Sequence, residues 1–252
     1  MTSYGPVFAR VYDRRWGGLA ERLAPRLLAF YEDTPIARRN RSVLDICCGT
    51  GRLALHFLDN CFQVTGLDLS PHMLAVARDN AAQYVESGQA RFLQQDARRF
   101  SLEERFGLAV STFYAVNHFR HLEELMECFQ SVYRVTEEEG WFLFDMKTRL
   151  GLRGWSNILV DDGEDLMMVT RGIYDEESGT AHVKMTGFSR TEDGLYERFE
   201  ETLRNYAFPV QSIRQGLADV GWRHVYCARS SDLATPVQDP EQYPQVFLVA
   251  CK

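Results

Sequence analysis

The residues Val43-Leu44-Asp45-Ile46-Cys47-Cys48-Gly49-Thr50-Gly51 form the stretch that decides the fold of this chain. Its apolar first half contains one acid, Asp45, and is typical of a buried strand. The glycines predict a tight turn, and residues 52–60 have the spacing of a helix. A second apolar strand, over residues 62–67, ends at another acid, Asp68. This order of strand, glycine turn, helix and acid-tipped strand indicates a site for a nucleotide-containing cofactor.

The alternation of strands and helices continues along the chain. Ser70 and Pro71 predict the start of a helix that extends to residue 86, because serine caps helices and proline fits their first position. Another helix is expected over residues 122–135. Strands are expected at residues 42–47, 62–67, 90–95, 108–113, 141–146, 223–228 and 246–251. The pattern predicts an α/β fold: a doubly wound, mostly parallel, seven-stranded Rossmann-like sheet with helices on both faces.

The pattern changes after Thr148. Turn sequences at residues 161–163, 177–179 and 192–194 separate strand-like runs and predict an antiparallel β-hairpin insertion after the fifth strand. We therefore expect an N-terminal lid with the cofactor-binding core (residues 1–148), the insertion (149–208), and a final helix with two strands that complete the core (209–252). The insertion is expected to be a substrate cap or an oligomer contact, and a homodimer stays open.

The N-terminal region is helical in pattern and basic in charge. Apolar and arginine-rich positions alternate at helical spacing over residues 7–31, and Pro25 predicts a break into two helices. Residues 1–41 have eight arginines against four acids (8 − 4 = +4), whereas residues 161–201 have four bases against twelve acids (4 − 12 = −8). Two solvated faces are the expectation. The alternative is that one end meets an anion and the other repels one.

The overall composition excludes several classes of protein. With 252 residues, 45% hydrophobic and 25% charged, the chain is globular rather than collagen-like, coiled-coil or disordered. Its net charge of 28 − 35 = −7 argues against binding to nucleic acid. The six cysteines match neither C-x-x-C nor a Cys/His zinc pattern. Because neither a signal peptide nor a membrane span is recognisable, we expect a cytoplasmic protein with no membrane partner.

The charge of the glycine turn separates the candidate cofactors. Gly49, Gly51 and Ala54 fit the pattern of a dinucleotide site, so spacing alone leaves the cofactor open. A pyrophosphate would lie at the helix N-terminus, where the carboxylate of Asp45 would repel it. The same carboxylate suits a ligand with an ammonium group. The residues therefore favour S-adenosylmethionine, which has a ribose and an amino-acid tail but no phosphate.

The chain resembles the class I S-adenosylmethionine-dependent methyltransferases over essentially its whole length. The resembling residues are Leu44–Gly51, Gly66–Ser70, Met73-Leu74, Ala77-Arg78, Gln95–Ala97, Val132–Val135 and Gly140–Asp145. The resemblance implies that Asp45 orients the methionine ammonium and that Asp68 holds both ribose hydroxyls. It also implies that Cys47 contacts the cofactor through its backbone and that Gly49 and Gly51 let the cofactor lie close.

Further roles follow from the same resemblance. Leu69 and Met73 are expected to pack on the adenine, and Asp96 with Ala97 to meet its amino edge. A carbonyl near Thr112 or Phe113 is expected beside the methionine amine. The segment Phe8–Asp13 resembles the aromatic lid of this family, which places Tyr4 and Tyr12 near the sulfonium. An aromatic ring there favours the cation.

The end of the fourth strand indicates the kind of acceptor. Ser111-Thr112-Phe113-Tyr114 differs from the Asp/Asn-Pro-Pro-Tyr of nucleic-acid amino methyltransferases, and the chain contains no Pro-Cys nucleophile. Ser111 and Thr112 are also not typical ligands of a hard cation. These absences and the acidic net charge argue for a small-molecule acceptor and no metal.

The stretch Phe113–Phe119 resembles a Phe-x-x-x-x-His-Leu stretch in amino-sugar N-methyltransferases that also have antiparallel strands after the fifth strand. Related enzymes with this insertion methylate hydroxyls, carboxylates or other amines. His118 is the candidate general base or substrate-positioning residue, and Tyr12 is a second catalytic candidate. Tyr114 and Asn117 are expected to line the substrate pocket.

The function expected from the sequence is transfer of a methyl group from S-adenosylmethionine to an amine or hydroxyl of a small molecule, with release of S-adenosylhomocysteine. Two alternatives remain open at this point. One is a catalytically silent scaffold or regulator that binds the cofactor. The other is an oxidoreductase that uses a nucleotide cofactor.

Overall fold

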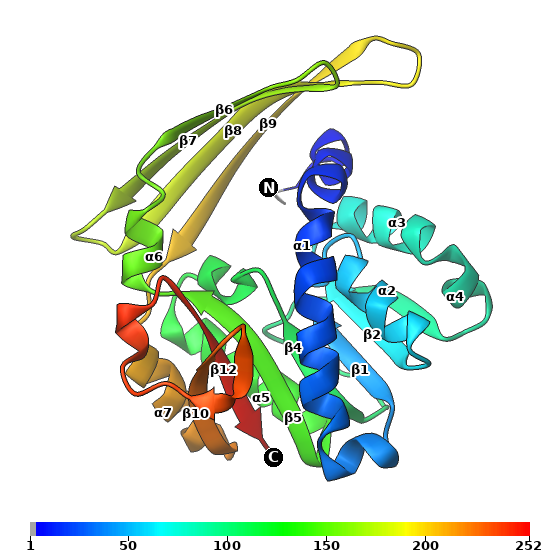
Figure 1. The fold of residues 1–252 in the computed structure, drawn as a ribbon, viewed down its shortest axis with the longest axis vertical. Helices are drawn as coiled ribbons and strands as arrows, with labels where there is room; N and C mark the ends of the chain where they lie inside the picture. Colours follow the sequence, from blue (N-terminus) through cyan, green and yellow to red (C-terminus); the bar gives the residue numbers. More distant parts are fainter. Residues whose placement is uncertain (1–3) are drawn as a thin grey trace.

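The computed structural model describes residues 4–252 and confirms the α/β architecture, with a large sheet and a smaller one (Figure 1). The large sheet has the strand order β11-β10-β12-β5-β4-β1-β2-β3. Strands β1 to β5 in this sheet pair in parallel, whereas β12, β10 and β11 pair antiparallel. The strands are β1 (Ser42–Ile46), β2 (Gln63–Asp68), β3 (Ala90–Gln94), β4 (Phe106–Ser111), β5 (Thr136–Lys147), β10 (Arg223–Arg229), β11 (Asp232–Pro236) and β12 (Gln245–Cys251).

Helices cover both faces of the large sheet. Val43 joins the apolar cluster on the side of α1 (Pro6–Glu32), α2 (Arg52–Asp59) and α3 (Pro71–Asn80). Its neighbour Leu44 joins the opposite cluster, with α5 (Leu122–Val135) and α7 (Val210–Val220). This switch follows from the alternation of side chains along a strand. The short elements are α4 (Ala82–Glu86), α6 (Arg149–Arg153), η1 (Pro35–Arg38), η2 (Ala115–His118) and η3 (Pro240–Gln242). Within residues 4–252, no helix combines the length and apolar character needed to cross a membrane.

All seven strands expected from the sequence are present, and β11 adds an eighth at the edge of the sheet. The sequence of β11, Asp232-Leu233-Ala234-Thr235-Pro236, has no clear alternation, so its pattern predicts no strand. It forms because the chain turns back directly after β10 and pairs antiparallel with it. Its proline is tolerated at this position because the outer side of an edge strand needs no backbone donor.

The structure corrects the expectation that Pro25 divides the N-terminal helix, because α1 is one helix with Pro25 inside it. A proline inside a helix costs about 3 kcal/mol, since it removes a backbone hydrogen bond. Leu23, Ala24, Leu27 and Leu28 flank the proline and are all buried. Full burial of one leucine contributes about 1.5–3 kcal/mol, so packing outweighs the local cost. Conversely, the helix expected over residues 70–86 is interrupted at Ala81, between α3 and α4.

The insertion forms a second, antiparallel sheet in the order β6-β7-β8-β9. Its strands are β6 (Ile158–Asp162), β7 (Leu166–Asp175), β8 (Thr180–Arg190) and β9 (Tyr196–Tyr206). The second and third turns fall at the predicted sequences 177–179 and 192–194, whereas Asp161 and Asp162 of the first predicted turn belong to β6 and the turn lies at residues 163–165. In Figure 1 this sheet arches over the N-terminal end of α1, away from the large sheet. Its inner face packs Met168, Met185 and Phe199 against Phe8 and Val11 of α1.

The basic N-terminal region and the acidic insertion meet at this seam through ion pairs whose side chains stay partly exposed. Arg10 forms an ion pair with Glu197 at 2.5 Å, and Arg15 forms one with Asp161 at 2.7 Å. Arg14 donates to the hydroxyl of Ser189. The opposite charges therefore partly neutralise each other across the contact between α1 and the small sheet.

Candidate functional site

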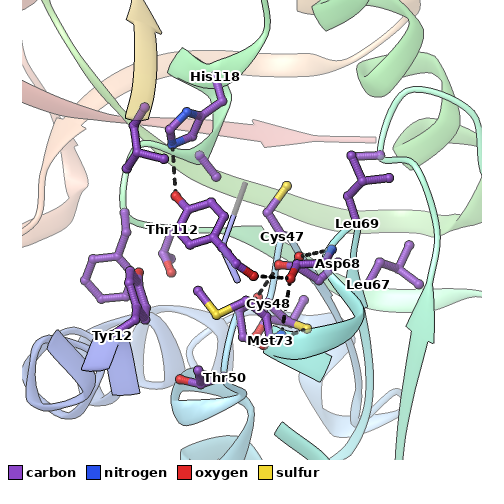
Figure 2. A pocket seen from close by; sticks show the side chains of 18 of the residues that line it. Tyr12, Cys47, Cys48, Thr50, Leu67, Asp68, Leu69, Met73, Thr112 and His118 are labelled. Carbon is purple, nitrogen blue, oxygen red and sulfur yellow. Dashed lines mark hydrogen bonds between the residues drawn. The ribbon is translucent and has the colours of Figure 1, made fainter. Parts of the chain in front are cut away.

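A cavity of about 1140 Å³ lies at the carboxyl ends of the central strands. Its lining comes from the loops after β1, β2 and β4, from the N-terminal part of α1, and from β9 (Figure 2). In doubly wound sheets, ligands bind in the crevice outside the carboxyl ends of the strands. The cavity is therefore the candidate functional site.

The glycine turn after β1 forms the floor of the cavity. Gly49 and Gly51 have positive φ angles of 55° and 74°, and Cys47 also lies in the left-handed region with φ of 58°. A Cβ atom on Gly51 would lie 3.1 Å from the Cβ of Ala77 and 3.2 Å from the ring of Phe92. Glycine is therefore required at this position both for its conformation and for its lack of a side chain.

Asp68 lies at the end of β2 and is oriented by the backbone. The amide of Gly49 donates to its Oδ2 at 2.9 Å, and the amide of Ser70 donates to its Oδ1 at 2.8 Å. Burial raises the pKa of Asp68, and these backbone hydrogen bonds oppose the rise. Each carboxylate oxygen can accept a further hydrogen bond. The side chain is thus a fixed double acceptor beside the glycine turn, which fits the two hydroxyls of a ribose.

Asp45 provides the second carboxylate of this half of the cavity. It is 2% exposed, and its Oδ2 has no hydrogen-bond partner among the described residues. Burial, with a smaller effect from Asp68, raises the pKa of Asp45 to about 8. A buried carboxylate without a partner is costly and is stabilised by a cation. Its place beside the turn therefore fits the ammonium of an amino-acid tail.

The predicted adenine residues also line the cavity. Met73 is buried and Leu69 is exposed, so the two offer an apolar surface at the start of α3. Asp96 and Ala97 lie on the loop after β3. The guanidinium of Arg98 pairs with Asp96 at 2.6 Å and lowers the pKa of that carboxyl. This ion pair has no signal in the sequence, and it fixes the carboxylate of Asp96 at the cavity wall.

Aromatic rings in and just before the first turns of α1 line the cavity where the sequence predicts an aromatic lid. The ring centroids of Tyr4 and Tyr12 are 6.0 Å apart in an edge-on arrangement, and Trp16 lies 5.4 Å from Tyr12. Ser70 donates to the backbone carbonyl of Tyr4 at 3.1 Å, which ties the lid to the loop after β2. Trp16 was missed from the sequence, although its spacing of four residues from Tyr12 places both on one helix face.

His118 lies at the end of η2 and reaches the cavity from the β4 side (Figure 2). Its Nδ1 is 3.0 Å from the carbonyl oxygen of Arg204 on β9. A carbonyl can only accept, so Nδ1 carries the hydrogen of the neutral ring and the lone pair of Nε2 is an acceptor. The Nε2 atom is 3.5 Å from the hydroxyl of Tyr4. The surrounding protein lowers the pKa of His118 by desolvation and so favours this neutral form.

The structure contradicts the expectation that Tyr114 and Asn117 line the cavity, since neither belongs to its lining. Asn117 is fully buried, and its amide nitrogen donates to the carbonyls of Lys147 and Tyr206 at 3.1 and 2.9 Å. The Tyr114 ring instead packs edge-on against Trp155 at 5.4 Å. The loop that contains both residues begins with left-handed backbone conformations at Phe113 and Tyr114.

Strand β9 contributes a wall of the cavity that the sequence analysis missed. Its lining residues are Glu200, Glu201, Thr202, Leu203, Arg204 and Tyr206. Glu201 also accepts a hydrogen bond from the amide of Gly5 at 2.6 Å, at the beginning of α1. No local motif marks these residues, because their place at the cavity depends on how the small sheet packs against the start of α1 and reaches His118.

Comparisons with known proteins agree on one family. Residues 43–140 match the family model described as "Methyltransferase domain". The chain is 30% identical to the protein named "Putative methyltransferase YqeM" of Bacillus subtilis (strain 168) over 185 residues, which are 72% of this chain and 73% of that one. Its fold is similar to that of an S-adenosylmethionine-dependent methyltransferase from Clostridium acetobutylicum, with a TM-score of 0.78, 18% identity and 97% of both chains covered. The sugar N-methyltransferase KedS8 from Streptoalloteichus gives a TM-score of 0.75 at 18% identity, with 100% of this chain and 94% of that one covered.

Proposed function

The chain belongs to the class I S-adenosylmethionine-dependent methyltransferases, and from this premise we propose that it methylates an amine or hydroxyl of a small molecule. The observation that supports the proposal most is the placement of His118. Its unprotonated Nε2 faces the same cavity as Asp45 and Asp68. The cavity therefore combines a cofactor-binding half with a nearby proton acceptor.

The cofactor half of the proposal rests on two carboxylates and the glycine turn. Asp68 would accept hydrogen bonds from both ribose hydroxyls while the amides of Gly49 and Ser70 keep it oriented. The unpartnered oxygen of Asp45 would accept from the methionine ammonium. Bound S-adenosylmethionine supplies an electrophilic methyl group on its sulfonium. The rings of Tyr4 and Tyr12 would favour that positive charge and exclude water from it.

The acceptor half of the proposal rests on His118 and the lid. An amine or hydroxyl that approaches Nε2 can give up its proton there, because the Nδ1 hydrogen is retained by the carbonyl of Arg204. Much of the rate would come from holding the two reactants in line in a closed site. Among residues 4–252, no three His, Cys, Asp or Glu side chains are grouped to hold a metal ion.

The acceptor class is proposed from the shape and chemistry of the site. Strand β9 and the loop after β4 bring polar and charged groups to the cavity, including Thr202, Glu201 and Arg120. Such a lining suits a hydrophilic acceptor such as an amino sugar. The similar fold of a sugar N-methyltransferase supports this choice. The small sheet would act as the cap of the acceptor site.

The proposal is tested by incubating the protein with methyl-labelled S-adenosylmethionine and a panel of amino sugars, simple amines and hydroxylated analogues. We expect a labelled product and one equivalent of S-adenosylhomocysteine per methyl group, with no loss of activity in EDTA. His118→Ala should lose this activity, whereas His72→Ala, an exposed histidine at the start of α3, should keep it. Tight cofactor binding without turnover on any acceptor would instead favour a silent scaffold or regulator.

A further inference from the structure

We infer that Asp145 and Asn117 are positioning residues that hold the loop of residues 113–118 in the conformation that faces the cavity. This inference rests on the proposed function, because the loop borders the cofactor and acceptor halves of the same cavity. Thr112, Phe113, Ala115 and His118 all belong to the cavity lining. Asp145 and Asn117 do not, so they act through the loop and not on a ligand.

The loop begins with an unfavourable backbone conformation. Phe113 and Tyr114 are consecutive and have φ angles of 61° and 50°. Residues other than glycine rarely adopt this left-handed region, and bulky aromatic residues adopt it least readily. Two such residues in a row persist only where the surrounding structure holds them in place. Side chains outside the loop must therefore supply that restraint.

Asp145 restrains the first half of the loop. It lies near the end of β5, is fully buried, and its Oδ1 accepts a hydrogen bond from the backbone amide of Tyr114 at 3.0 Å. Its Oδ2 accepts from the side-chain amide of Gln245 on β12. The neighbouring Phe144 is paired with Ser111 of β4, and Asp145 itself is paired with Phe247 of β12. The carboxylate thus lies on a strand that is paired on both sides within the large sheet. It is therefore a rigid hydrogen-bond acceptor for the amide of Tyr114.

Asn117 restrains the second half of the loop. Its Oδ1 accepts from the backbone amide of Lys147 at 2.8 Å, and its Nδ2 donates to the carbonyl of Lys147 at 3.1 Å. The same Nδ2 donates to the carbonyl of Tyr206 at the end of β9. One side chain therefore joins the loop to the last residue of β5 and to the small sheet.

The two anchors fix His118 relative to the cavity. His118 follows Asn117 directly, and its Nδ1 contacts the carbonyl of Arg204, two residues before Tyr206 on β9. The loop, the large sheet and the small sheet are thereby held in one arrangement. Without the anchors, the loop would leave its strained conformation, and the fraction of protein competent to bind ligand would fall.

The test measures the affinity of the purified full chain for S-adenosylmethionine and S-adenosylhomocysteine by calorimetry. Asp145→Ala removes the acceptor of the Tyr114 amide, and we expect the dissociation constant of both ligands to rise about 10-fold or more. Asp145→Asn keeps an oxygen for that amide and can pair with a rotated Gln245 side chain. We therefore expect the asparagine variant to recover most of the lost affinity, to within about threefold of the wild type.

A matched control separates positioning from general stability. Thr136→Val removes a buried hydroxyl at the opposite end of β5, which donates to the carbonyl of Val132. It should lower the melting temperature and leave both dissociation constants unchanged. If Asp145→Ala does not fold, Gln245→Ala tests the same anchor, because it releases one oxygen of Asp145; a weaker affinity is again expected. Unchanged affinity in the folded Asp145→Ala or Gln245→Ala variant would overturn the inference, whereas a wild-type protein without affinity for either ligand would overturn the proposed function.

Discussion

The two halves of the cavity are built in different ways. The cofactor half comes from one short stretch of chain, in which Asp45, Gly49, Gly51 and Asp68 belong to a single strand-turn-helix-strand unit. The acceptor half brings together α1, the loop after β4 and strand β9, which are far apart in the sequence. A local unit has a recognisable motif, whereas an assembled wall has none. The difference explains why the cofactor is easier to infer than the acceptor.

The two halves also differ in how their polar groups are satisfied. In the cofactor half, the Oδ2 of Asp45 has no hydrogen-bond partner within residues 4–252, and a ligand could provide one. In the acceptor half, the Nδ1 of His118 donates to the carbonyl of Arg204, and its Nε2 is an acceptor 3.5 Å from the hydroxyl of Tyr4. The first arrangement is suited to binding, and the second is suited to proton transfer. Variants in each half should therefore change different measured quantities.

The largest expected effect is on the chemical step. If His118 is the general base, His118→Ala should lower kcat by roughly 10²–10⁴-fold, because proton transfer by a placed side chain contributes that much. The affinity for S-adenosylmethionine, measured by calorimetry, should stay the same. A smaller loss that falls mainly on the KM of the acceptor would assign His118 to substrate positioning. A variant with normal kinetics and only a lower melting temperature would assign it to the fold.

The next effect belongs to the cofactor half. Asp68→Ala should weaken binding of both S-adenosylmethionine and S-adenosylhomocysteine by roughly 10–150-fold, since a lost hydrogen bond to a charged group costs about 1.5–3 kcal/mol. Asp79→Ala, an exposed acid on α3, is the matched control and should leave both affinities unchanged. Equal affinities for the wild type and the Asp68 variant, measured by calorimetry, would remove Asp68 from the site.

The large sheet could be predicted from the sequence because its signals are local. Apolar runs such as residues 42–47 and caps such as Ser70 mark where strands end and helices begin, and the Ser70 hydroxyl does cap α3 through the amide of Met73. The family motifs could likewise place Asp45 and Asp68 at strand ends. These features depend on a few neighbouring residues, so a single sequence contains them.

The remaining features depend on tertiary packing. The continuity of α1 through Pro25 follows from burial of the flanking leucines, which no local propensity shows. The contacts of Asn117 with Lys147 and Tyr206, and of Tyr114 with Trp155, join residues far apart in the sequence, and the left-handed conformation of Phe113 has no sequence signal in an aromatic residue. The pairing of the basic α1 with the acidic insertion requires the path of the small sheet. In each case, the deciding contacts join residues that are distant along the chain or conformations that are locally unfavourable.

A third prediction concerns the charge of Asp45. Its pKa of about 8 means that the free protein holds this carboxyl mostly protonated at neutral pH. An ammonium ligand favours the ionised form, so binding must release a proton at pH values below about 8. Affinity for S-adenosylmethionine should therefore rise with pH, by up to about tenfold per unit, and level off near pH 8.

The measurement for this prediction is calorimetry of S-adenosylmethionine binding at several pH values in buffers of different ionisation enthalpy. Asp45→Asn should bind more weakly at pH 8 and should lose most of the pH dependence. Stability has the opposite sign. Because the folded pKa lies above the ordinary value of 3.8, the contribution of Asp45 to the free energy of unfolding falls as pH rises from about 4 to about 8. A flat affinity profile in the wild type would show that Asp45 does not meet the ammonium.

The smallest expected effect lies at the seam that closes the acceptor half. Arg15 and Asp161 form an ion pair at 2.7 Å, but their side chains are 51% and 37% exposed. Solvent screens such a pair, so a double-mutant cycle with Arg15→Ala and Asp161→Ala should give a coupling of only about 0.2–1 kcal/mol in the free energy of unfolding, less at high salt.

The apolar contact of Phe8 with Phe199, whose ring centroids are 5.8 Å apart, should contribute more to the free energy of unfolding than this ion pair does. Phe8→Ala should cost about 3–5 kcal/mol, the usual loss for a buried phenylalanine. Urea unfolding of the four proteins of the cycle and of Phe8→Ala measures both free energies. A coupling free energy larger than the loss caused by Phe8→Ala would mean that charge, and not packing, holds the small sheet in place.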